Sequence, residues 1–177
     1  MKCFFLRSVV LILILCTQNL SAQDSNGTVA GIRQTFAEIN SYTNYRIVTI
    51  DESEQFLGHA TDNGGSLKGY YKGDTLRKII EWVGLSNRVV QNEYYFGNGQ
   101  LLFVYSTDKQ YRFDDKRGQF DYTSFSAISA ARFYFNNGRL IESVFSNKEE
   151  EAAKAQTAAR LFSSSTSYAR LLGEKGQ

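Results

Sequence analysis

The sequence predicts an α+β fold: an antiparallel β-meander of about seven or eight strands with an N-terminal amphipathic helix and a C-terminal helix. Two observations lead to this prediction. Over residues 45–145, short runs rich in Tyr, Phe, Val and Ile alternate with Gly and Asn, as expected for strands joined by tight turns. Helical spacing of apolar residues is found before this region, and a helix-start motif follows it.

The first 22 residues predict a cleavable secretory signal. Two basic residues precede an apolar run, VVLILILC, that is about half as long as a membrane span requires, which argues against a retained anchor. Ala22 is the expected last residue of the signal. Cys16 ends the apolar run, but bulky Leu15 occupies the place where lipoprotein signals carry a small residue, so lipidation is not expected. We therefore expect an exported protein, periplasmic or secreted, whose mature chain has no transmembrane segment.

Residues 23–177 have the size of a single domain. Cys3 and Cys16 are the only cysteines, so the mature chain has neither a disulfide nor a thiolate nucleophile. Lys2 and Arg7 account for the whole charge excess of the chain, which leaves the mature domain formally neutral with interspersed charges. Such a charge distribution does not favour nucleic-acid binding.

Four apolar residues recur at spacings of three and four near the start of the domain: Val29, Ile32, Phe36 and Ile39. This stripe predicts an amphipathic helix from about Val29 to Asn40, with Arg33 turned away from the apolar side. At the other end, Ser146 and Glu149 form a capping box that predicts a second helix through an alanine-rich run. Serines are expected to interrupt this helix, leaving residues 163–177 loose.

Three segments between the helices share a pattern of two aromatic residues, a turn and an aliphatic residue: Tyr70–Leu76, Tyr94–Leu101 and Phe133–Leu140. In the last two, an Asn-Gly pair occupies the turn. A two-residue hairpin turn that follows the strand twist needs positive φ at both central positions, which Asn tolerates and Gly adopts freely. Gly99 and Gly138 are therefore predicted to be structural turn residues.

These aromatic-x-x-Gly-x-Leu hairpins resemble those of MORN-type repeat proteins and of uncharacterised exported bacterial proteins that carry them between a helix and a C-terminal segment. The resemblance covers roughly residues 60–145. The anchor residues Tyr71, Tyr95 and Tyr134 are 24 and 39 positions apart, so a regular solenoid is not expected. The resemblance implies a fold and an exported location, and it implies no activity.

The chain offers few groups for catalysis. His59 is the only histidine, and with no cysteine in the mature chain a zinc site lacks ligands. Acidic clusters at residues 51–54 and 114–121 lack the spacing of a calcium loop, so we expect no metal and no cofactor. Ser66 follows His59 closely, but the sequence has no Gly-x-Ser-x-Gly elbow and no phosphate-binding glycine loop. A small envelope hydrolase using His59 is kept as the weakest alternative.

Aromatic residues are more numerous than one sheet face needs, with eleven tyrosines, thirteen phenylalanines and Trp82. We expect both helices to cover one face, leaving tyrosine and tryptophan among arginine and lysine on the other, as in recognition surfaces. Alternatively, the connection over residues 114–129 and the C-terminal tail cover that second face. The candidate ligand-binding residues are Trp82, Arg88 and Tyr94. The sequence thus predicts an exported, non-catalytic binding or interaction module of unknown partner, with a structural envelope protein as the alternative.

Overall fold

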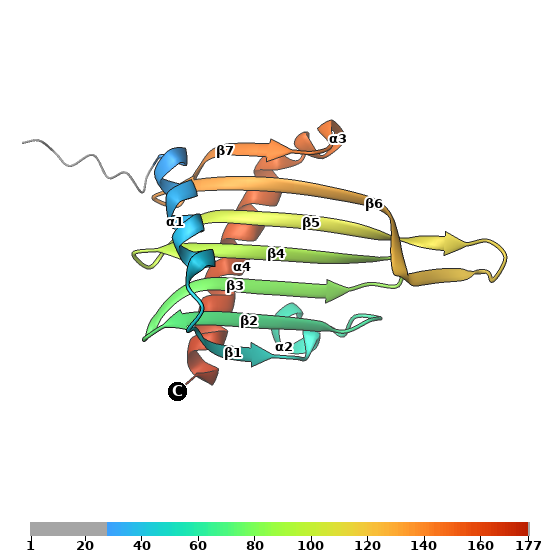
Figure 1. The fold of residues 1–177 in the computed structure, drawn as a ribbon, viewed down its shortest axis with the longest axis horizontal. Coiled ribbons are helices and arrows are strands. Elements are labelled where there is room, and N and C mark those ends of the chain that lie inside the picture. Colours follow the sequence, from blue (N-terminus) through green and yellow to red (C-terminus); the bar gives the residue numbers. More distant parts are fainter. Residues whose placement is uncertain (1–27, 177) are drawn as a thin grey trace, which may run out of the picture.

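The computed structural model describes residues 28–176, which form a seven-stranded antiparallel sheet with helices on both of its faces (Figure 1). The spatial order of the strands is their order in the chain, from β1 at one edge to β7 at the other. The predicted meander is therefore confirmed, as is a helix at each end of it. The predicted signal peptide, residues 1–22, lies outside the described residues, and so do both cysteines.

The elements have the following bounds: α1 Val29–Ser41, β1 Arg46–Ile50, α2 Ser53–Leu57, β2 Gly65–Lys72, β3 Thr75–Gly84, β4 Arg88–Gly97, β5 Gln100–Asp114, β6 Gln119–Asn136, β7 Arg139–Phe145, α3 Lys148–Glu151 and α4 Lys154–Lys175. The first helix agrees with its predicted span to within one residue. Its apolar stripe is buried on the sheet, and the side chain of Thr28 caps its first turn by accepting a hydrogen bond from the Gly31 amide at 3.1 Å.

The two long helices lie on opposite faces of the sheet, which corrects the expectation that they share one (Figure 1). Successive strand residues point to opposite sides. Tyr94 and Phe133 therefore pack under α4, while their chain neighbours Tyr95 and Tyr134 pack under α1. We call these two sides the α4 face and the α1 face. The abundance of aromatic residues thus supplies two cores rather than one core and a bare surface.

The C-terminal helix continues without a break to Lys175, so the expectation of a loose tail after residue 163 is wrong. Ser165 and Thr166 bond back to the preceding turn, where Ser165 Oγ donates to the Phe162 carbonyl oxygen at 2.7 Å and Thr166 Oγ1 donates to it at 3.4 Å. Tyr168 and Leu172 are buried against the sheet. Burial of these two side chains outweighs the weak helix preference of the serines.

Residues 114–129 cover neither face. They belong to a long arm formed by the far ends of β5 and β6, which projects well beyond the other strands (Figure 1). Aromatic side chains pair along the arm, with Tyr111 stacked on Phe125 at 5.2 Å between ring centroids and Phe113 edge-on to Phe120 at 5.1 Å. The α1 face next to the arm therefore has no cover from this segment.

Both predicted hairpin turns are confirmed. Asn98 and Gly99 have φ values of 51° and 75°, and Asn137 and Gly138 have values of 48° and 75°. Positive φ at both central positions is the geometry of a type I′ turn. The two turns connect β4 to β5 and β6 to β7, and they fix the register of the strands that carry the buried aromatic residues.

Candidate binding site

The α1 face of the sheet is only partly covered. The helix crosses one end of the strands, and within residues 28–176 no helix lies in front of the rest of this face (Figure 1). Ile32 and Ile39 of the helix are buried against a small cluster of sheet residues: Tyr95, Leu102, Phe103 and Tyr134. Farther along the same face, Ile47, Ile128 and Val144 are exposed. The boundary between the covered and the open part is where a ligand can reach both helix and sheet.

The C-terminal end of α1 is held to the sheet by a polar network. Asn40 Oδ1 accepts hydrogen bonds from Lys78 Nζ at 3.2 Å and from Tyr95 Oη at 3.3 Å. Lys78 forms an ion pair of 2.7 Å with Glu93, which also accepts a 2.6 Å hydrogen bond from Tyr95 Oη. Although burial opposes its ionisation, these bonds lower the pKa of Glu93, and burial together with Glu93 raises the pKa of Tyr95. Lys78 and Glu93 are thus engaged with each other and with the helix.

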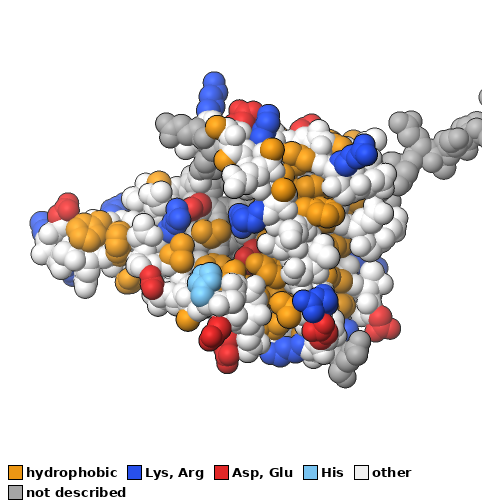
Figure 2. Space-filling model, turned by 180° about the vertical axis from the view of Figure 1, so that it is seen from behind, with side chains coloured by type: hydrophobic (Ala, Val, Ile, Leu, Met, Phe, Trp, Pro, Cys, Tyr) orange, Lys and Arg blue, Asp and Glu red, His pale blue; other side chains and the backbone are white. Residues whose placement is uncertain are grey.

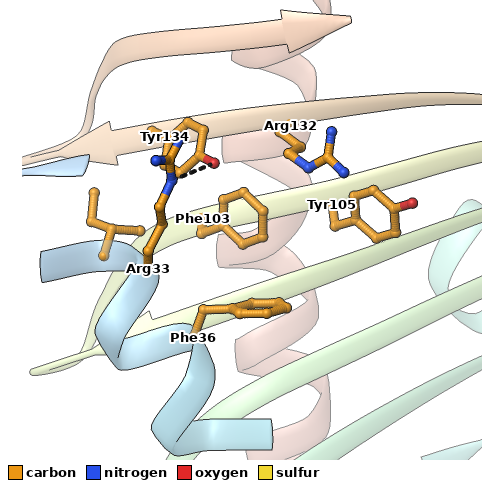
Figure 3. A pocket seen from close by; sticks show the side chains of 7 residues that line it. Arg33, Phe36, Phe103, Tyr105, Arg132 and Tyr134 are labelled. Atoms are coloured by element: carbon orange, nitrogen blue, oxygen red, sulfur yellow. Dashed lines mark hydrogen bonds between the residues drawn. The ribbon is translucent and has the colours of Figure 1, made fainter. Parts of the chain in front are cut away.

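A pocket of about 290 Å³ lies where α1 meets β5 and β6. We call it the α1 pocket, and Figure 3 shows its lining residues: Ile32, Arg33, Phe36, Phe103, Tyr105, Arg132 and Tyr134. Ile32, Phe103 and Tyr134 are buried and form its floor, whereas Phe36 and Tyr105 are half-buried and form its sides. The ring of Phe36 stands edge-on to that of Phe103, with centroids 5.4 Å apart.

Two arginines stand at the mouth of the α1 pocket, on the side of β6 (Figure 3). Arg33 Nε donates a long hydrogen bond of 3.5 Å to Tyr134 Oη. The guanidinium of Arg132 lies 5.3 Å from the ring centroid of Tyr105, within the range of a cation–π contact. Neither arginine forms an ion pair with a carboxylate among the described residues. The hydrogen bond to Tyr134 and, more weakly, the charge of Glu142 raise the pKa of Arg33.

The lining of the α1 pocket consists of apolar, phenolic and guanidinium groups. Among the described residues, this lining contains no carboxylate, histidine, serine or thiol that would serve as a general base or nucleophile. Aromatic walls with a few polar groups at one end are typical of small-molecule sites. The chemistry available here is therefore reversible binding of an apolar group with a polar end.

The three ligand-binding candidates from the sequence do not form one surface. Trp82 is half-buried on the α1 face, where the β3–β4 register pairs it with Gln91. Tyr94 lies on the α4 face and is fully buried, and Arg88 lies on that face in a 3.2 Å ion pair with Asp108. The sequence alone does not give the register of the β3–β4 hairpin, and this register places Trp82 on one face of the sheet and Tyr94 and Arg88 on the other. None of the three lines the α1 pocket.

The structure places no nucleophile or carboxylate beside His59 among the described residues, as the hydrolase hypothesis would require. His59 follows α2 on the surface, where its Nδ1 lies 3.2 Å from the Leu57 carbonyl oxygen, and its pale blue side chain is exposed (Figure 2). Within residues 28–176, no hydrogen bond links it to Ser66 or to a carboxylate. Ser66 instead sits in β2 opposite Trp82.

The α4 face carries a second hollow, of about 420 Å³ and mostly polar, near the base of the arm. Arg88, Asp108 and Arg160 contribute to its lining, and the ion pair between the first two occupies part of it. Figure 2, which views this face, shows charged side chains of both signs scattered around a hydrophobic middle rather than gathered in one patch.

The described part of the chain contains no candidate for a metal site or for a membrane-crossing helix. No group of three His, Cys, Asp or Glu side chains is arranged there to hold a metal ion. No helix in that part is both long and apolar enough to cross a membrane.

The sequence analysis did not identify Arg33 and Arg132 as site residues, although the spacing of each from an aromatic residue of the pocket is visible in the sequence. Arg33 precedes Phe36 by three residues, so it borders the apolar stripe of α1 instead of turning away from it. Arg132 and Tyr134 are two residues apart in one strand and therefore share a face. Exposed arginines are common on surfaces, and only the position of α1 relative to β6 shows that these two meet at a pocket.

Comparisons with protein-family models, with curated proteins and with solved structures gave no significant match to this chain. The similarity of its hairpins to MORN-type repeats therefore stays a prediction.

Proposed function

We propose that this chain is a non-catalytic binding module whose ligand site is the α1 pocket. The observation that carries the proposal is an aromatic pocket with two arginines at its mouth that form no ion pair among the described residues. Both walls are held by contacts within the chain. The helix wall is held by the Asn40 network and the buried Ile32, and the sheet wall by β5 and β6. Preformed walls reduce the entropy that binding costs.

Two other functions are less well supported. A hydrolase would require a nucleophile and a base within hydrogen-bond reach, and His59 has no such partner among the described residues. A purely structural envelope protein would gain nothing from an open aromatic pocket, because filling it would add stability. A binding role explains both the pocket and the sparse set of catalytic groups.

The proposed site of action is outside the cytoplasm. The form of residues 1–22 supports export, and the absence of cysteine from residues 23–177 is compatible with an oxidising compartment. A ligand of this protein would then be a small molecule of the periplasm or of the surroundings of the cell.

The pocket is tested by two-dimensional amide NMR of the purified protein against a panel of small acids, amines, alcohols and sugars. We expect at least one class to shift the amide signals of Phe36, Phe103 and Tyr105 together. Tyr105→Ala, which removes a side wall, should weaken that binding. Tyr122→Ala, which removes an exposed ring on the arm, should not. Shifts confined to the arm, or no shifts with any class, would refute the α1 pocket as the ligand site.

A further inference from the structure

We propose that the ligand of the α1 pocket is a carboxylic acid with a single aromatic ring, bound as its monoanion with the ring inside and the carboxylate at the mouth. This inference rests on the proposed binding function and adds the chemical class of the ligand. It follows from three properties of the pocket: its size, the order of its lining residues from floor to mouth, and the charge at its mouth.

The size of the pocket fits one ring and a short chain. A cavity of roughly 150 Å³ in a protein core is enough to hold a benzene molecule. The α1 pocket has about 290 Å³, which leaves room for a ring, a linker of about two carbons and a carboxylate. A larger ligand of fused rings would extend onto the open part of the α1 face.

The lining changes from apolar to cationic from the floor outward. Phe103 and Tyr134 are 5% and 3% exposed, so the deep part of the pocket is lined by buried aromatic rings. Phe36 and Tyr105 are half-buried beside it and present ring edges and faces to an incoming ring. Offset or edge-to-face contacts with such walls favour an aromatic body over a flexible acyl chain, which would lose more conformational entropy.

The mouth of the pocket carries an excess of one positive charge. Arg33, which comes from the helix, lies beside Tyr134, and Arg132, which comes from β6, lies beside Tyr105, both on the β6 side of the mouth (Figure 3). Glu142 is close enough to affect Arg33 electrostatically, although the two form no ion pair. Two guanidinium groups and one carboxylate leave a net charge of about +1, which a monoanion balances. A guanidinium also matches the planar shape of a carboxylate and can bind it through two parallel hydrogen bonds.

The lysine of the helix anchor does not compete for the ligand. Lys78 is bound to Glu93 and Asn40. A dianion such as a phosphate monoester would bring one more negative charge than the mouth can balance, and it would lie near Glu142. The site therefore favours an aryl carboxylate over an aryl phosphate.

The test is an NMR titration of the purified protein at low salt with 3-phenylpropanoate, its neutral amide 3-phenylpropanamide, and phenyl phosphate. We expect the carboxylate to bind at least about tenfold more tightly than the amide, the factor typical of one charge-assisted hydrogen bond. Arg132→Gln and Arg33→Gln should each remove much of this advantage, because each should weaken binding of the carboxylate more than binding of the amide. Arg117→Gln, at the exposed tip of the arm, is the matched control and should change neither ligand's affinity. Added salt should weaken carboxylate binding selectively.

The outcomes separate the ligand class from the binding function. Equal affinity for the acid and the amide, or tighter binding of phenyl phosphate, would overturn the carboxylate assignment while the pocket remains a binding site. Binding of a different class from the panel, with no response to 3-phenylpropanoate, would do the same. If no compound of any class shifts the pocket amides, both proposals fail. Both arginines are exposed, so their substitution by glutamine leaves the cores intact, and an unchanged amide spectrum verifies this for each variant.

Discussion

Tyr168, in the last helix, donates a hydrogen bond of 2.8 Å to the buried carboxylate of Glu81 in β3, 87 positions earlier in the chain. The same carboxylate accepts hydrogen bonds from Tyr94 Oη at 2.7 Å and from Asn92 Nδ2 at 2.8 Å. Glu81 is only 3% exposed and forms no ion pair among the described residues. Three donors therefore replace the water that this carboxylate has lost, and one of them fixes α4 to the sheet.

Removal of the Tyr168 hydroxyl should destabilise the fold. Tyr168→Phe keeps the ring packed on Phe56 and Tyr94 but takes one donor from a buried carboxylate. We expect the free energy of unfolding to fall by about 1.5–3 kcal/mol, the range for hydrogen bonds to charged groups. Urea denaturation gives the value, and Tyr122→Phe on the exposed arm, which should change it by less than about 0.5 kcal/mol, is the control. Similar losses for both variants would contradict a special role for the Glu81 site.

The protein should lose stability at alkaline pH. Burial, with the nearby charge of Glu81, raises the pKa of both Tyr94 and Tyr168 above the ordinary value of about 10. The folded state therefore holds these two phenol protons more tightly than the unfolded state does. The stability that they contribute is complete below about pH 10 and is lost as the pH rises further. We expect the urea midpoint to be flat from pH 8 to 9 and to fall above about pH 10.

Absorbance at 295 nm checks the same prediction, because it detects ionised tyrosine. Tyr94 and Tyr168 should be the last tyrosines to ionise, and they should ionise only as the protein unfolds, which loss of the circular dichroism signal reports. Ionisation of all eleven tyrosines while the protein is still folded would show that Tyr94 and Tyr168 are not protected as the Glu81 site requires.

The β4–β5 turn gives a clean test of backbone conformation. A Cβ added at Gly99 meets no atom within 4 Å, so any cost of substitution there comes from its φ of 75° and not from a clash. Gly99→Val should destabilise by about 1–3 kcal/mol, whereas Gly99→Asn should cost much less, because Asn tolerates the left-handed region. Thermal melts of the two variants measure the difference. Equal tolerance of Val and Asn would mean that the turn adopts another conformation.

Gly138 offers a second case for the same substitutions. A Cβ at Gly138 comes within 3.4 Å of the Phe162 ring of α4. That distance is an ordinary van der Waals contact, so the cost again comes from the φ of 75°, and we expect Gly138→Val to destabilise by about 1–3 kcal/mol, as at Gly99.

Export is tested on protein recovered from the cells that make it. The intact mass of protein from the envelope or medium should match a chain that begins at Gln23 and carries no lipid. Such a chain has no cysteine, so a reducing agent should leave its melting temperature unchanged. A mass matching an acylated chain that begins at Cys16 would show a lipoprotein instead.

The sequence predicts those parts of the fold that depend on local chemistry. Apolar spacing locates α1, and the Asn-Gly pairs locate both type I′ turns, because positive φ is a property of the residues themselves. Strands bounded by such turns pair with their chain neighbours, which gives the meander.

The remaining features depend on packing between distant segments. The serines of α4 disfavour a helix locally, but Tyr168 bonds to Glu81 and Leu172 packs where Gly69 leaves room, and these contacts decide the outcome. A register shift in the β2–β3 pairing leaves the β2 neighbour of Trp82 unpredictable from the turn position alone. The α1 pocket forms only because α1 packs on one particular face of the sheet. Both faces are apolar enough to pack against a helix, so the sequence alone does not show which face α1 covers.

The strand order of this sheet has a consequence for how the chain acquires its structure. Each strand pairs with the one immediately before it, so a chain emerging amino terminus first from a ribosome or translocation channel can build the sheet one hairpin at a time. Helix α4 cannot join the sheet until its residues, up to Lys175, have emerged. Through that interval the side of the sheet destined for α4 is uncovered and the Glu81 carboxylate lacks the Tyr168 donor. The nascent protein is then most exposed to aggregation and proteolysis. A chain that is stalled on the ribosome or shortened before α4 should therefore bind holding chaperones, whereas the folded protein should not.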